Sequence, residues 1–366
     1  MSHGVSPCCV KTVDRWYRSF LAVRGGHHSE GMTRYFLEAN RDLVPLFADM
    51  LGNVEFRVAA SKSIGQARMQ PLACAGCGSH VALVILGLPF MLMLFRIQVI
   101  FHSMIDNWEI IPEGNGRYRE RIKWLEPGDF QVRQLRLGLD MYLGEKEVTL
   151  EGMRELLAPL DHGSPESKRV FLEAMRVAES WGVAHEFFHV CTGPAGGEQF
   201  PQFKPLADSY RDALDFAGRF CEQVCAHNKL EPDIRLSWLE EFQADLMACK
   251  LMLIAIADNR YRDVKGVEVP QKDARFQAAR IVLNGVAAAL DAVYWVDVHR
   301  ASPVSSEDAR TSSHPPHFFR WNLMKAYVKG IARLYDDTVS SNTEVMARLS
   351  RRLSVAYKRA AKKHHT

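Results

Sequence analysis

The segment His185-Glu186-Phe187-Phe188-His189 constrains this chain most, because its two imidazoles meet only if the segment is helical. Residues four apart share one face of a helix, so both rings can bind one Zn²⁺. Glu186 lies one step round the helix and can reach a water on that metal. The neighbouring residues are uncharged, as expected of a helix buried beneath a cleft. The pattern HExxH therefore predicts a helical metal site.

A second carboxylate-rich segment, Ser-Trp-Leu-Glu-Glu-Phe-Gln-Ala-Asp, begins at Ser237. Ser237 and Glu240 have the spacing of a capping box, so we expect a helix to begin there. Glu240 then has a structural role, and Glu241 can bind a metal, with Asp245 one turn later on the same face. Two histidines and one glutamate are a known catalytic zinc set that leaves one position for water. We predict Glu241 as the third ligand and Asp245 as the hydrogen-bond partner that orients His185.

These motifs together resemble a known family. His185-Glu-x-x-His189 followed by Glu241-x-x-Ala-Asp245 is similar to the gluzincin metallopeptidases, most nearly the branch of HtpX-like and CAAX prenyl endopeptidases. That branch often carries a later His-Pro-x-x-x-x-Arg motif, which His314-Pro-Pro-His-Phe-Phe-Arg320 matches. The resemblance spans roughly residues 165–325 and is carried by these three short motifs.

The resemblance implies a zincin-like catalytic domain. The roles it implies are the zinc ligands His185, His189 and Glu241, the general base Glu186, and His314 and Arg320 as groups that bind substrate or stabilise the oxyanion. The chain lacks the several clear transmembrane helices of the membrane members. The resemblance therefore does not extend to a membrane-embedded protease with a prenylated substrate.

The chemistry expected of such a site is amide hydrolysis without a covalent intermediate. Zinc lowers the pKa of a bound water to about 7 and polarises the scissile carbonyl. Glu186 would take the proton from that water and pass it to the leaving amine. We therefore expect a zinc-dependent endopeptidase that acts on a protein or peptide. Two alternatives stay open: a zinc hydrolase of a non-peptide amide, and a non-catalytic zinc-stabilised regulatory or binding protein.

The same residues also have plain structural explanations. The two histidines of HExxH could be satisfied core residues, and Asp245 could be a surface carboxylate. A Pro-Pro pair after His314 is first of all a rigid turn, and Arg320 could be a charge at a helix start. The ExxAD segment and the HPxxxxR motif downstream favour the metal site over two core histidines.

The net charge and the N-terminal residues bear on the binding partners and the compartment that we expect for this chain. The net charge of +3 and pI of about 8.4 are too mild to indicate a specific nucleic-acid partner. Residues 1–30 contain no continuous apolar segment of a secretory signal, so we expect a cytoplasmic protein with reduced cysteines. The tail from Arg348 to Thr366 has seven Lys or Arg and no acid, which is typical of a solvated helix end or of contact with anionic lipid or nucleic acid. The oligomeric state does not follow from the sequence.

Two further segments have competing interpretations. Cys74-Ala-Gly-Cys77, with His80 after it, is either half of a second zinc site or, as we favour, a pair of free thiols in a loop. Residues 81–101 are apolar enough to span a bilayer. Gly87 and Pro89 divide them, so we favour a buried strand followed by a helix with proline in its first turn, and membrane contact is not favoured.

These patterns predict a mainly α fold with a small β-sheet (α+β) and a zincin-like metallopeptidase domain. The expected domains are an N-terminal helical region at 1–70, the metallopeptidase domain at 71–345 and a basic tail at 346–366. Periodicity, turn residues and caps predict helices within 11–50 and at 165–193, 205–228, 238–258, 272–298 and 319–335, a loop at 61–79, and short strands between 107 and 148.

Overall fold

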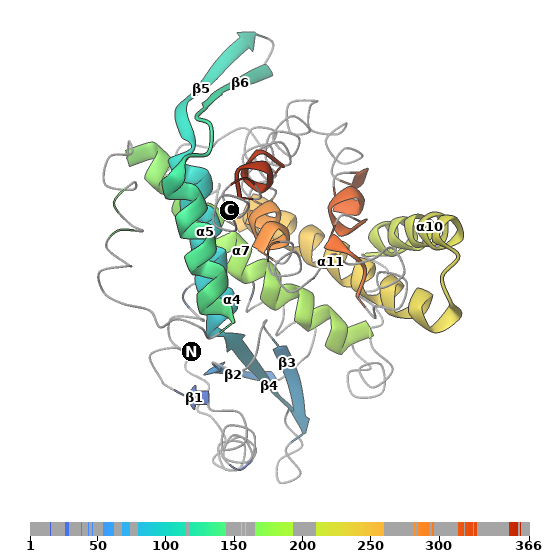
Figure 1. Ribbon diagram of the computed structural model, residues 1–366. Coiled ribbons are helices and arrows are strands. Elements are labelled where there is room, and N and C mark those ends of the chain that lie inside the picture. Colours follow the sequence, from blue (N-terminus) through green and yellow to red (C-terminus); the bar gives the residue numbers. More distant parts are fainter. Residues whose placement is uncertain are drawn as a thin grey trace. The chain divides into compact units, whose positions relative to one another are not determined.

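The structure is a computed structural model of the 366-residue chain (Figure 1). It describes residues 80–114, 117–143, 165–192, 210–259, 285–292, 314–317, 319–324 and 351–357, the strands at 26–28, 54–61 and 68–73, and some single positions. The described part is mostly helical. This confirms the expected predominance of helix over sheet.

The chain forms two compact units. The first unit comprises Met1–Met91, Ser180–Ala255 and Arg310–Pro315, and the second comprises Leu92–Glu179, Ile256–Ala309 and Pro316–Thr366. The proposed domain boundaries at residues 70 and 345 stay a prediction.

The first unit contains a four-stranded sheet. Its strands are β1 (Gly26–His28), β2 (Val54–Ser61), β3 (Arg68–Ala73) and β4 (His80–Gly87), in the order β1-β2-β4-β3. β2 runs parallel to β4, while β3 pairs with β4 in the antiparallel sense. The predicted loop at 61–79 is therefore wrong over β3. The residues of β3 have only a weak local preference for extended structure, and pairing with the apolar strand β4 makes them a strand.

The apolar segment that begins at residue 81 is a strand followed by a helix, as predicted. β4 ends at Gly87 and α4 (Leu88–Ser103) begins at the next residue, with Pro89 in its first turn. Met93, Leu94 and Ile97 of α4 are fully buried. Within the described residues, no helix combines the length and the apolar character needed to cross a bilayer.

The second unit continues with a β-hairpin and a helix. β5 (Ile105–Gly114) and β6 (Arg117–Trp124) pair antiparallel as a two-stranded ribbon, which confirms the short strands expected after residue 107. The helix α5 (Asp129–Tyr142) was not predicted. The Pro127-Gly128 pair marks its start, because the Gly128 N–H donates to Oε1 of Gln131 at 2.9 Å and caps the helix.

Three longer helices follow along the chain: α7 (Pro165–Thr192), α10 (Arg211–Asn228) and α11 (Pro232–Asn259). Pro165 begins α7 as predicted. The capping box at Ser237 is wrong, because α11 already begins at Pro232 and the residues after it are in its interior. Proline has the backbone φ of a first helical residue and lacks the N–H that would be unsatisfied there.

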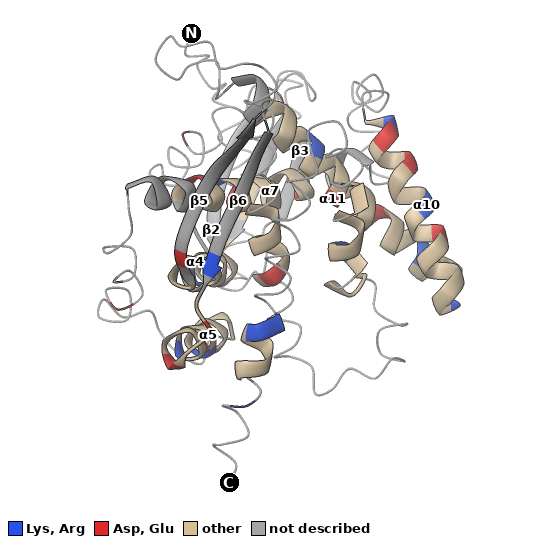
Figure 2. Cartoon of the chain, turned by 90° about the horizontal axis from the view of Figure 1, so that it is seen from above, with Lys and Arg blue, Asp and Glu red and all other residues tan. Residues whose placement is uncertain are grey.

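Aromatic side chains fix the helices of the first unit against one another. Phe188 of α7 packs on the Tyr210 ring with 5.3 Å between centroids, and Phe220 of α10 packs on Phe242 of α11 at 5.4 Å. Trp238 is also buried, one turn before Phe242. The opposite face of α10 carries interspersed acidic and basic residues (Figure 2). This pattern is typical of a solvated helix face.

Several predicted segments lie partly or wholly outside the described residues. Within the predicted helices 272–298 and 319–335, residues 285–292 and 319–324 are helical. Residues 351–357 of the basic tail are helical as well. The prediction of a helical N-terminal region at 1–70 is wrong over β1 and β2, which are strands of the four-stranded sheet. Most of the rest of 11–50, residues 205–209, and the pair Cys74 and Cys77 lie outside the described part.

Candidate metal centre

The two histidines of HExxH meet on α7 as their spacing predicts. Their Nε2 atoms lie 3.0 Å apart, and the rings meet edge to face with 4.6 Å between centroids. His185 is buried, whereas His189 is half-buried. The Trp181 ring lies one turn earlier, 5.5 Å from the ring of His185. Both imidazoles therefore present the same nitrogen to one point beside the helix.

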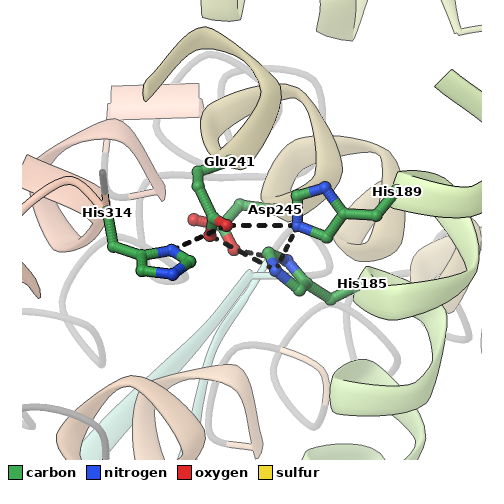
Figure 3. A network of polar contacts seen from close by, with 5 residues as sticks. All are labelled: His185, His189, Glu241, Asp245 and His314. Carbon is green, nitrogen blue, oxygen red and sulfur yellow. Dashed lines mark hydrogen bonds and ion pairs between the residues drawn. The ribbon is translucent and has the colours of Figure 1, made fainter. Parts of the chain in front are cut away.

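Glu241 of α11 supplies a carboxylate to that point (Figure 3). Its Oε2 lies 3.4 Å from Nε2 of His185, and its Oε1 lies 3.3 Å from Nε2 of His189. An ion held tetrahedrally at about 2.0–2.1 Å separates its ligand atoms by about 3.3 Å. The three observed separations of 3.0, 3.4 and 3.3 Å fit such an ion. His185, His189 and Glu241 thus form a group that could hold a metal ion.

Asp245 lies behind the first histidine, in the place predicted for it. Its Oδ1 is 3.0 Å from Nδ1 of His185, and the carboxylate is fully buried. A histidine that binds a metal through Nε2 needs a partner for its Nδ1–H, which fixes the tautomer and the ring orientation. Asp245 is one turn after Glu241 on α11. One face of that helix therefore provides both the candidate ligand Glu241 and the carboxylate that contacts the candidate ligand His185.

His314 approaches the same carboxylate from a third segment of the first unit. Its Nδ1 lies 2.9 Å from Oε1 of Glu241. The side chain is 71% exposed, in contrast to the 9% of Glu241. His314 was predicted to act on substrate, and its contact with a candidate ligand was not foreseen.

The electrostatics of the centre are those of a buried carboxylate among imidazoles. Burial favours the protonated form of Glu241, but the contacts from His185, His189 and His314 outweigh it and hold the pKa of Glu241 well below its usual range. Burial also opposes charge on His185, yet Asp245 and Glu241 raise the pKa of His185 to about 9. A divalent cation at Nε2 of His185 would take the place of the proton that faces Glu241, while Nδ1–H of the same ring stays directed at Asp245.

The remaining predicted site residues are not placed at the centre by the described contacts. Glu186 follows His185 on α7 and is half-buried. Arg320 is buried in the second unit. Cys74 and Cys77 lie outside the described residues. The catalytic roles predicted for Glu186 and Arg320 stay predictions, and so does the expectation that Cys74 and Cys77 are free thiols.

The second unit holds a buried polar cluster that was not predicted. Asp291 is fully buried and accepts a hydrogen bond from Nε1 of Trp321 at 3.2 Å. Nε2 of His317 lies 3.8 Å from the same oxygen. The sequence offered one signal for it, the second histidine of His-Pro-Pro-His. The cluster anchors the segment that begins directly after the first unit ends at Pro315.

Comparisons with protein-family models, with curated proteins and with solved structures found no match to this chain.

Proposed function

We propose that this protein is a zinc-dependent endopeptidase of zincin-like fold. The observation that carries the proposal is the convergence of His185, His189 and Glu241 at the separations of a tetrahedral site. Two imidazole nitrogens and one carboxylate oxygen are a donor set that suits zinc, and three protein ligands are the number found in catalytic sites. The HExxH, ExxAD and HPxxxxR motifs support the same class by resemblance to gluzincins.

Zinc bound there would lower the pKa of a coordinated water and polarise the carbonyl of a peptide bond. Glu186 is the general base in this proposal: it accepts the proton from the attacking water and donates it to the leaving amine. Asp245 keeps His185 in the tautomer that presents Nε2. Arg320 is proposed to help bind substrate or stabilise the oxyanion.

A replacement of Glu186 tests the proposal. The Glu186→Gln variant should bind zinc as the wild type does and should lose at least about 100-fold in kcat, because general acid-base catalysis typically contributes that much. The matched control is Glu240→Gln, which removes a half-buried carboxylate of α11 next to the ligand.

The measurement is cleavage of a mixed peptide library by the zinc-loaded proteins, followed by mass spectrometry of the products. Cleavage by wild type and Glu240→Gln but not by Glu186→Gln is the expected result. No cleavage by any zinc-loaded protein, or equal cleavage by all three, would contradict the assignment as a peptidase with this base.

A further inference from the structure

We infer that His314 is a positioning residue for Glu241: its Nδ1 holds Oε1 and so keeps the carboxylate facing the two imidazoles of the metal centre. The inference rests on the metal-binding part of the proposed function, and it does not require that the protein cleave peptides. The Nδ1 edge of the His314 ring, which faces Glu241, thus has a role other than substrate binding.

The contacts of the carboxylate carry the inference. Oε1 of Glu241 is approached by Nδ1 of His314 at 2.9 Å and by Nε2 of His189 at 3.3 Å, while Oε2 lies 3.4 Å from Nε2 of His185. His314 is the nearest of the three. A rotation of the carboxylate about its terminal bond would break the contact with His314. The ring therefore fixes the orientation in which both oxygens face the imidazoles of α7.

The direction of this hydrogen bond follows from the charge of Glu241. A carboxylate has no N–H to give, and in its ionised form it only accepts hydrogen bonds. Nδ1 of His314 therefore carries the proton and donates it. The other edge of the ring faces away from the carboxylate (Figure 3), and the side chain is 71% exposed. The two edges of the ring thus have separate surroundings.

The residue after His314 explains how an exposed side chain is held in place. Pro315 is buried, and a residue that precedes proline is restricted to extended backbone conformations. This restriction lowers the conformational entropy that the hydrogen bond must overcome. The His-Pro pair therefore presents Nδ1 to Glu241 from a stiff backbone.

The test uses two replacements that separate the edges of the ring. His314→Ala removes both nitrogens. His314→Asn keeps a side-chain N–H close to the position of Nδ1 but has no group in place of Nε2. The control is His227→Ala, which removes an exposed histidine at the end of α10. Zinc affinity of the full-length chains is measured at one pH by competition with a chromogenic chelator, and thermal melts in chelator check the fold.

The expected result is a loss of about 10- to 100-fold in zinc affinity for His314→Ala, because partners that orient ligands typically contribute that much. His314→Asn should stay within about threefold of the wild type, as should His227→Ala. Wild-type affinity in His314→Ala, or equal losses in the Ala and Asn variants with intact folds, would overturn the inference.

The outcomes also separate this inference from the wider proposal. If wild type binds zinc in the His314-dependent way but cleaves no peptide, the peptidase assignment fails and the positioning role stands. If wild type binds no zinc, the metal centre fails and the positioning role fails with it.

Discussion

The buried imidazole of His185 lies between two carboxylates of the metal centre. The carboxylates of Glu241 and Asp245 lie on either side of the ring of His185, which is only 7% exposed. They raise the pKa of His185 to about 9, against the desolvation that burial imposes. In the metal-free protein the imidazole is therefore protonated at neutral pH, whereas a metal ligand must be neutral.

This opposition predicts a pH dependence of metal binding. Between about pH 7 and 9, zinc must displace the proton of His185, so the zinc affinity should rise up to tenfold per pH unit and flatten above about pH 9. Calorimetry in buffers of different ionisation enthalpy should show about one proton released from this residue at pH 7.5. An affinity that does not change between pH 7 and 8.5 would contradict the prediction.

The same pKa has the opposite effect on the metal-free fold. Because the folded value is raised above the ordinary 6.5, the stabilisation from these contacts is fully present below about pH 6.5 and is lost as the pH rises through about 9. The variant Asp245→Asn removes the negative charge beside Nδ1 of His185 and keeps an acceptor oxygen there. It should reduce both the proton release on zinc binding and this loss of stability above neutral pH.

How far these residues could be predicted depends on their distance in sequence. The pairs His185 and His189, and Glu241 and Asp245, each lie one turn apart on a helix, so local spacing was enough to predict their shared faces. His314 lies 73 positions from Glu241. The His-Pro motif located it near the site, but no local pattern determines which ring nitrogen faces which oxygen.

At the scale of elements, the start of α7 was predictable and that of α11 was not. Pro165 is the one strong start signal before the HExxH helix. Two signals compete before α11, Pro232 and the capping box at Ser237, and the structure follows the proline. Burial of Trp238 against Phe242 favours the longer helix, and that packing is tertiary information.

The elements missed altogether have weak local patterns. β3 is extended because β4 provides its hydrogen-bond partners from His80 onward. α5 follows two turn residues that also suit a strand end, and the buried face that identifies it, with Leu135 and Leu139, is completed only in the fold. Pairing and burial between distant segments therefore decided both.

Close helix packing in the second unit gives a prediction about stability. A methyl group added at Gly285 would lie 2.5 Å from Cγ1 of Val177 and 2.8 Å from the Ala174 carbonyl oxygen of α7. Gly285→Ala should therefore lower the free energy of unfolding by about 1–3 kcal/mol, because backbone atoms in a packed core cannot move aside cheaply.

The matched control is Gly218→Ala on α10, where no atom that the structure describes lies within 4 Å of the added methyl group. That variant should raise the free energy of unfolding by about 0.5–1 kcal/mol, since alanine is more favourable than glycine in a helix interior. Urea unfolding of both variants checks the pair. A Gly285→Ala protein as stable as wild type would contradict the packing.

At the scale of the whole molecule, the metal centre links segments that are far apart in the chain. Residues of α7, α11 and the segment at His314 all belong to the first unit, and a bound ion would join them. Anything that binds only the folded state stabilises it by mass action. Metal binding and stability of the first unit should therefore rise and fall together.

The central claim is that His185, His189 and Glu241 hold one zinc ion. The most direct test is the zinc content of protein purified without chelators, by elemental analysis, for wild type, Glu241→Ala and the control Glu240→Ala. The account predicts about one zinc per chain in wild type and in Glu240→Ala, and little or none in Glu241→Ala. No zinc in the wild type, or zinc that Glu241→Ala retains, would contradict it.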